Sequence, residues 1–345
     1  VIYDTNAHIG IVYRVDAAGR VYYMDAHPDF TISRSVYGPQ FGQSPAALGG
    51  GLKNWRPLRL VDATREDGAL IGGRYIFARN SQIPDFSLVQ YLGTGHDNYD
   101  EPRWSYNGAP LRYYEYARVA ISGGKSEFNP VYELEATMGT LCNDLNDRVQ
   151  AVNQAVANGI STKPHPSDIP SNIYNSDDSE WESYATPARD ARLRAAFVSF
   201  RQELGRMIGL WLARDPRIVY DGLDLKHDLL AAYDHESRGC TITVLSSDKR
   251  PMPMTFDDIS HSLFAMSFDP YNCVELRWGR EGSGCPDQAG KRHWYDVEGQ
   301  ARHMIDPDGG AAAGLPDTDI RGLIAGMPAR TPWVQPMPGR TATLR

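Results

Sequence analysis

The sequence predicts an α+β protein, in which a small antiparallel sheet at the N-terminus is followed by a larger, mainly helical and loop-rich part. Two β-branched and aromatic segments on either side of a glycine-containing turn, within residues 6–35, predict the sheet. Apolar residues recurring at three- and four-residue steps over 130–159 predict a long helix. The strands therefore precede the helices along the chain, which is the order typical of an α+β fold.

The composition is that of a folded protein and excludes several functional classes. The chain has 345 residues, of which 41% are apolar and 23% charged, so one large domain or two ordinary ones are expected. We expect no membrane span, because no apolar run reaches about 18 residues. The net charge of -8 argues against a nucleic-acid partner, since phosphate backbones attract basic surfaces.

The first hairpin is the most clearly marked element. The segment "HIGIVYRV" at 8–15 and the segment "VYYMDA" at 21–26 read as strands, joined by a turn over 16–19. A third strand is expected in "FTISRSVYG" at 30–38, and "LRLVDA" at 58–63 indicates another. Residues 1–128 are thus expected to form a β part with long loops.

The character of the sequence changes near Pro130. Proline suits the first turn of a helix and glycine its end, so Pro130 and Gly159 bound the first long helix. Thr186 and Pro187 form an N-cap and first helical residue for a second helix that extends to about residue 215.

The remaining sequence mixes helices, a strand and a tail. Segment 221–237 is expected to be helical and 240–248 to contain a strand, and Thr255 ahead of Asp258 is a capping pattern. We assign 129–304 to a helical part that packs on the β part. Residues 305–345 are rich in Gly, Pro and Ala, which predicts an extended tail.

The four cysteines contain no C-x-x-C pair, which argues against a zinc ribbon or a thioredoxin-type motif. Cys273 and Cys285 lie twelve residues apart across a glycine-rich turn, so a disulfide between them is expected as one interpretation. Such a bond forms in an oxidising compartment, which favours a periplasmic or extracellular protein.

The first hairpin resembles the histidine-bearing part of the NlpC-type cell-wall peptidases, which have a papain-like fold. The resemblance covers residues 1–42, where "HIGIVY" at 8–13 matches the first strand of the family motif and "VYYMDA" at 21–26 matches the second. It implies a thiol hydrolase or acyltransferase that acts on an amide or ester. The expected substrate is a peptide or glycopeptide, in particular bacterial cell-wall peptide.

The resemblance assigns chemical roles to specific residues. A cysteine nucleophile needs an imidazole that holds it as thiolate, and the imidazole needs a third group that fixes its orientation. By resemblance, His8 is the base and Asp25 the orienting residue. His27 is the alternative orienter, because a register shift of two residues keeps the same face of the strand.

The position of the nucleophile stays open between two alternatives. In the usual order of the family the cysteine precedes the histidine, and none of the seven residues before His8 is a cysteine. Either the nucleophile lies upstream of Val1, or the order is permuted, as in relatives that resemble lecithin-retinol acyltransferase. Cys142 is the permuted candidate if the chain breaks at Gly139-Thr140 and a new helix begins, because a helix N-terminus lowers a thiol pKa.

A second hypothesis is a catalytically inactive papain-like module that acts as an envelope or extracellular binding or structural protein. No cofactor or metal site is expected, since H-E-x-x-H is absent and the histidine spacings fit no metal motif. The acidic stretch at 175–184 with Trp181 offers a platform for a cation or a sugar, although such stretches are more often solvated loops.

Overall fold

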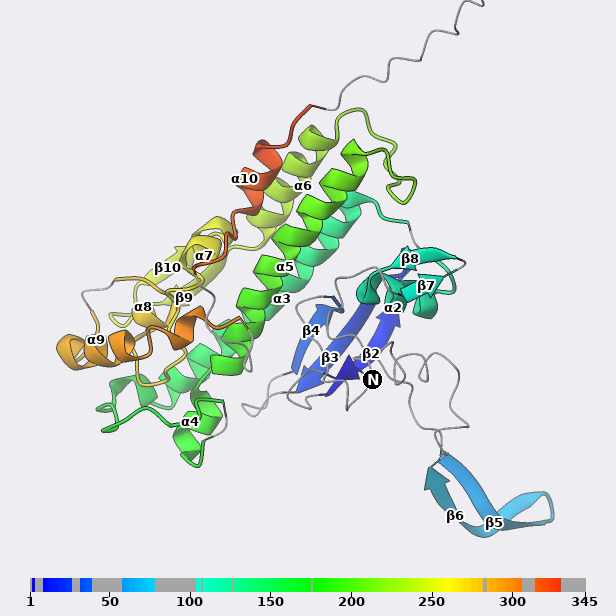
Figure 1. Ribbon diagram of the computed structural model, residues 1–345. Coiled ribbons are helices and arrows are strands. Elements are labelled where there is room, and N and C mark those ends of the chain that lie inside the picture. The colour runs from blue at the N-terminus through cyan, green and yellow to red at the C-terminus, as the bar shows by residue number, and fades with distance from the viewer. Residues whose placement is uncertain are drawn as a thin grey trace, which may run out of the picture.

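The computed structural model confirms an α+β protein, with small antiparallel sheets near the N-terminus followed by a helical body (Figure 1). It describes the following residues: 2–3, 9–26, 32–38, 58–77, 104–106, 108–125, 127–174, 176–281, 284–305 and 314–329.

The N-terminal sheet has four strands in the order β1-β2-β3-β4, and every neighbouring pair is antiparallel. The strands are β1 (Ile2–Tyr3), β2 (Ile9–Val15), β3 (Val21–Ala26) and β4 (Ile32–Val36). The predicted hairpin is therefore confirmed as β2 and β3, and the predicted third strand as β4.

The turn of this hairpin is closed by a single carboxylate. Asp16 Oδ1 accepts hydrogen bonds from the amides of Ala18 (2.9 Å) and Arg20 (3.0 Å), and Oδ2 accepts from Arg20 Nε (2.7 Å). Gly19 has a φ of 82°, and a Cβ at that position would lie 2.9 Å from Ser122 Cβ. The turn thus requires glycine both for its backbone conformation and for its approach to helix α2 (Tyr113–Ser122).

Two further hairpins and α2 complete the β part. Strands β5 (Leu58–Glu66) and β6 (Ala69–Phe77) pair along their length and project away from the body (Figure 1). Strands β7 (Trp104–Tyr106) and β8 (Ala109–Leu111) form a short hairpin that leads directly into α2.

Three long helices lie side by side and form the body: α3 (Pro130–Ala157), α5 (Pro187–Leu212) and α6 (Leu225–Gly239) (Figure 1). Asn129 caps α3 by accepting a hydrogen bond from the Val131 amide at 3.1 Å, and proline occupies the first turn of both α3 and α5. Both long helices therefore begin where the sequence predicts.

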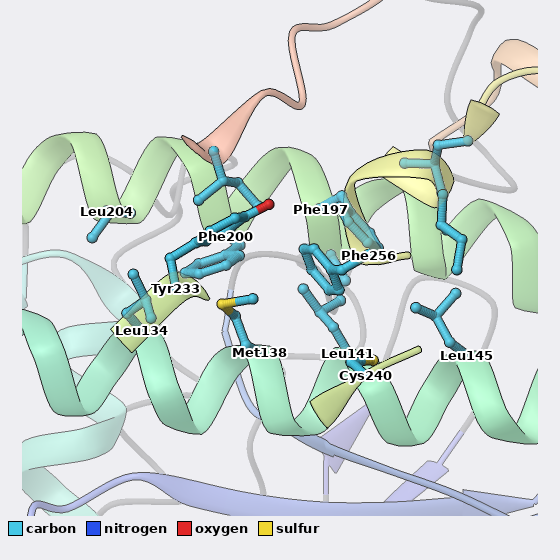
Figure 2. Packing of buried hydrophobic residues seen from close by; sticks show 14 of the residues in the cluster. Leu134, Met138, Leu141, Leu145, Phe197, Phe200, Leu204, Tyr233, Cys240 and Phe256 are labelled. Atoms are coloured by element: carbon cyan, nitrogen blue, oxygen red, sulfur yellow. The ribbon is translucent and has the colours of Figure 1, made fainter. Parts of the chain in front are cut away.

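The main hydrophobic core fills the space between these helices. Leucine and methionine side chains one turn apart on α3 face phenylalanines on α5, and side chains from α6 and α7 (Phe256–Ser262) close the layer (Figure 2). The periodicity that predicts α3 is the periodicity of this buried face. The residues labelled in Figure 2 are Leu134, Met138, Leu141, Leu145, Phe197, Phe200, Leu204, Tyr233, Cys240 and Phe256.

Shorter elements pack around the body, with α4 and α9 at one end and α10 against α6 and α5 (Figure 1). They are η4 (Ile160–Thr162), α4 (Ser179–Tyr184), β9 (Ile242–Leu245), β10 (Pro251–Met254), α8 (Val274–Arg277), α9 (Gln288–Val297), η5 (Ala301–His303) and α10 (Ile320–Ala325). The predicted Thr255–Asp258 capping box is present at the start of α7.

One segment differs from its sequence expectation. Residues 305–345 are expected to form an extended tail, yet α10 lies within them and buries Ile320 and Ile324 in the main core. Asp319 caps α10 by accepting a hydrogen bond from the Gly322 amide at 2.7 Å. The two isoleucines are one helical turn apart. A pattern of two residues in a glycine-rich segment is too short to predict a helix from periodicity.

A buried ion pair connects α3, α5 and the segment that precedes α8. Arg148 Nε lies 2.7 Å from Asp190 Oδ1, and both residues are 0% exposed. Arg148 Nη2 donates to Asp190 Oδ2 (2.9 Å) and to the Ser267 carbonyl (3.0 Å), and the guanidinium lies over the Trp278 ring. Thr186 Oγ1 donates to the same carboxylate at 3.2 Å.

Replacing Arg148 with Met should lower the free energy of unfolding by about 3–5 kcal/mol, because Asp190 would remain as a buried charge without its partner. Urea denaturation at pH 7 measures the loss. The matched control is Arg74→Met, which removes an ion pair with Asp62 whose side chains are 72% and 69% exposed, and should cost less than about 1 kcal/mol. Equal losses in the two variants would show that the Arg148 pair does not organise the core.

Candidate functional site

The structure places one of the predicted catalytic residues, Asp25, in a buried position on β3. The residue is 5% exposed, and its Oδ2 lies 3.3 Å from Arg192 Nη1 on α5. Side chains alternate along a strand, so Asp25 shares its face with Tyr23 and Val21, which are also buried. This inner face of the sheet is the face directed at the helical body.

The other two predicted residues of this site, His8 and His27, lie outside the described residues. His8 directly precedes the first residue of β2, and His27 directly follows the last residue of β3. The expected base and the alternative orienter therefore remain predictions.

The environment of Asp25 is acidic, a feature that the sequence alone does not reveal. Asp144 on α3 lies close enough that burial, followed by the charges of Asp147 and Asp25, raises its pKa well above the usual range. Arg189 and Arg192 oppose this shift. The residue keeps some solvent exposure, but its carboxyl group lies among protein atoms. Burial and the two neighbouring carboxyl groups thus disfavour the charged form of Asp144, and perturbed carboxyl groups of this kind occur often at functional sites.

The structure corrects the expectation for Cys142. Its sulfur is bonded to Cys240, which follows α6, so in this state it is not a thiol. Cys142 also lies inside α3, twelve residues beyond its first residue, and Gly139-Thr140 does not interrupt the helix. A disulfide sulfur within a continuous helix has neither the proton nor the helix terminus that the nucleophile role requires.

The second disulfide joins Cys273 and Cys285, the pair that the sequence indicates. It closes a loop that contains α8, and it packs with Leu276 and Tyr295 in a small separate core. All four cysteines of the chain are thus engaged in disulfides.

Trp181 is not the sugar platform that the acidic stretch suggests. Its ring is 2% exposed, and its Nε1 donates to the Ile173 carbonyl at 3.0 Å. The neighbouring acids have structural partners, since Asp178 caps α4 and Glu180 pairs with Lys163. The segment is instead occupied largely by the short helix α4, which the buried Trp181 ring anchors.

A second histidine site, which sequence reasoning missed, connects the loop after η4 to the far end of the body. His165 Nε2 lies 2.6 Å from Asp269 Oδ2, its Nδ1 lies 2.7 Å from the Pro166 carbonyl, and its ring stacks on Trp294. Both ring nitrogens face oxygen atoms and the side chain is 4% exposed, so this histidine is a structural connection without an open nitrogen for catalysis. No motif in the sequence links residues 165 and 269, which lie 104 positions apart.

A cavity of about 130 Å³ lies where the sheet, α2, α3 and α5 meet. Its walls are largely apolar, with Val21, Tyr114, Phe128, Leu141 and Phe200 among them. Charged groups line it as well: Arg20, Arg112, Arg118, Arg206, Glu115, Glu133 and Glu203.

Within the described part of the chain, no group of three or more His, Cys, Asp or Glu is arranged to hold a metal ion. None of the described helices has the length and apolar character needed to cross a membrane.

Comparisons with known proteins add no relative. The sequence matches no protein-family model, and neither curated proteins nor solved structures gave a match. The resemblance of the first hairpin to the NlpC-type peptidases therefore rests on its own residues.

Replacing Asp144 with Asn should stabilise the protein at neutral pH and remove part of its pH dependence. A carboxyl whose folded-state pKa is raised stabilises the fold while it is protonated, and this contribution is lost as pH rises through the folded-state pKa. The difference in the free energy of unfolding between the variant and the wild type should therefore be small at pH 4 and grow towards pH 8. Urea denaturation across this range measures it, and a constant difference would contradict the raised pKa.

Removing the Cys142–Cys240 disulfide should destabilise the protein more than removing Cys273–Cys285. The bonds close loops of 98 and 12 residues, and loop-closure entropy gives about 4.7 and about 3 kcal/mol respectively. The Cys142→Ser/Cys240→Ser and Cys273→Ser/Cys285→Ser double variants, compared by urea denaturation under oxidising conditions, test the order. The reverse order would show that native-state packing, and not loop closure, dominates.

Proposed function

We propose that this chain carries the base-bearing part of a papain-like thiol hydrolase or acyltransferase that acts on an amide or ester, with bacterial cell-wall peptide as the expected substrate. In this proposal His8 is the general base and Asp25 is the residue that positions its imidazole. The thiolate is not one of the four cysteines of residues 1–345, because each of them forms a disulfide.

The observation that carries the proposal is the burial of Asp25 on the inner face of the sheet. The carboxylate lies beside buried Tyr23 and Val21, and Arg192 at 3.3 Å supplies the opposite charge that a buried carboxylate needs. Val12 of β2 pairs with Tyr23 and so lies on the same face. His8 directly precedes β2 in the sequence, and its role as the base rests on the resemblance of the first hairpin.

The chemistry follows from this arrangement. An imidazole beside a thiol takes its proton and later returns it to the leaving group, provided that the ring is held in one orientation. Asp25 would hold the ring and balance the imidazolium charge that forms. The nearby Arg192 stabilises Asp25 in its ionised form, which is the form that this role requires.

The disulfides support an oxidising location. Disulfides persist in secreted and periplasmic proteins and are rare in the cytosol. We therefore propose a periplasmic or extracellular protein, which is where cell-wall peptide would be met.

A second candidate function is favoured by a specific observation, the absence of a free thiol from this chain. If no cysteine outside residues 1–345 serves as nucleophile, the fold would act as an inactive module that binds peptide or glycopeptide in the envelope. This alternative has the same expected location and the same ligand class as the hydrolase, and it differs in that the bound peptide is not cleaved.

Thiol labelling distinguishes the two functions. The complete gene product, purified without reductant, is treated with iodoacetamide over pH 5–9, and the labelled cysteines are mapped by mass spectrometry. We expect fast labelling below pH 7 at a cysteine outside residues 1–345, and loss of this fast labelling in His8→Ala. Asp25→Asn should slow labelling or peptide hydrolysis by about 10²–10⁴-fold, whereas Asp62→Asn, at an exposed position on β5, should have no effect.

Labelling that is slow, follows the titration of an ordinary thiol and is unaffected by His8→Ala would reject the hydrolase. A gene product with no reactive cysteine would support the inactive module in its place.

A further inference from the structure

The cavity between the sheet and the helices combines an apolar interior with charged groups on its wall. Its volume of about 130 Å³ is close to that of cavities that accept one benzene-sized group. Pockets at the junction of structural layers, apolar with a few fixed polar groups, are the usual form of small-molecule sites.

One wall of the cavity presents two guanidinium groups and one carboxylate with unused hydrogen-bonding capacity. Arg118 uses Nε and Nη2 to reach the Ala18 carbonyl and Glu133 Oε1, and Nη1 makes no hydrogen bond to another described residue. Arg20 uses Nε towards Asp16 and Nη1 towards the Tyr132 carbonyl, and Nη2 likewise makes no bond within the described chain. Glu133 accepts through Oε1, so its Oε2 remains available.

The geometry holds these three groups firmly in place. Arg20 is fixed by the closed turn of the first hairpin, and Arg118 is fixed by the turn carbonyl and by contact with the Phe128 ring at 4.4 Å. Glu133 lies in the first turn of α3, where the helix N-terminus favours its negative charge. Their side chains keep 11–14% of their surface exposed, so a ligand can reach them.

The charges on this wall are balanced. Arg20 and Arg118 of the wall are balanced by Glu133 on the wall and by Asp16, which pairs with Arg20 just outside the cavity lining. Arg112 and Arg206, which also line the cavity, pair with Glu203 and Glu115. A ligand with a net charge would upset this balance, whereas a ligand that carries one positive and one negative group would not.

We propose that this cavity binds a free α-amino acid with a small apolar side chain. The carboxylate of the ligand accepts from Arg118 Nη1 and Arg20 Nη2, its ammonium donates to Glu133 Oε2, and its side chain enters the apolar interior beside Phe128 and Phe200. The site is distinct from Asp25, which does not line the cavity, and the inference does not depend on the proposed thiol chemistry.

Calorimetric titration and thermal denaturation of the oxidised protein test the site with L-leucine and L-valine as probes. We expect saturable binding and a ligand-dependent rise in Tm for at least one probe. N-acetyl-leucine lacks the ammonium and leucinamide lacks the carboxylate, so each should bind at least ten-fold more weakly than leucine. Absence of binding by both amino acids, or equal binding of leucine and its two analogues, would overturn the proposal.

Two variants locate the binding. Thr137→Leu on α3 fills the cavity with apolar volume, so it should abolish the ligand-dependent rise in Tm while leaving the Tm of the free protein unchanged or higher. The control variant Asn153→Leu introduces the same side chain at an exposed position of the same helix. It should bind the free amino acid as the wild type does. If Thr137→Leu binds leucine normally, the cavity is not the site.

The charge assignment has its own test, which remains informative if the cavity variant misfolds. Glu133→Gln removes the acceptor for the ammonium group. It should therefore weaken the binding of leucine at least ten-fold and leave the binding of N-acetyl-leucine unchanged. The Tm of the free variant shows whether it is folded. A folded Glu133→Gln variant with unchanged leucine affinity would contradict the proposed recognition.

Discussion

The helical body depends on one buried ion pair, between Arg148 of α3 and Asp190 of α5. Two charges without solvent are costly, and they persist because each is almost completely surrounded by partners: a bidentate contact, a backbone carbonyl, the Thr186 hydroxyl and the Trp278 ring. The pair fixes the register of the two longest helices against each other. It also positions Ser267, and with it the buried segment that leads to α8.

A second constraint joins the N-terminal sheet to this body. Residues 16–20 form a turn that Arg118 of α2 holds through the Ala18 carbonyl and that Arg20 connects to the start of α3. A turn held by two helices cannot move independently of them. The strands on either side, including β3 with Asp25, therefore keep a defined position relative to α2 and α3.

Local signals in the sequence were sufficient for most of the secondary structure. The hairpin, the two long helices with their proline starts, and the capping box at Thr255 follow from residues close together in the chain. Much less of the candidate site could be predicted from the sequence, because its features depend on contacts between residues that are far apart in the chain. The pairing of Cys142 with Cys240 spans 98 residues, the acidic surroundings of Asp25 come from α3, and α10 is helical through its packing on the core. A local sequence pattern does not encode such contacts. For this reason Cys142 could be interpreted as a nucleophile, although it forms a disulfide with a cysteine far along the chain.

The long-range disulfide has a consequence for the covalent integrity of the protein. Every peptide bond between residues 142 and 240 lies within the loop that this bond closes, including the polar stretch around α4 and the connection between α5 and α6. A protease that cuts anywhere in this region leaves both fragments joined through sulfur. A protein that works outside the cell, where proteases are abundant, would thus keep its two halves together after being nicked.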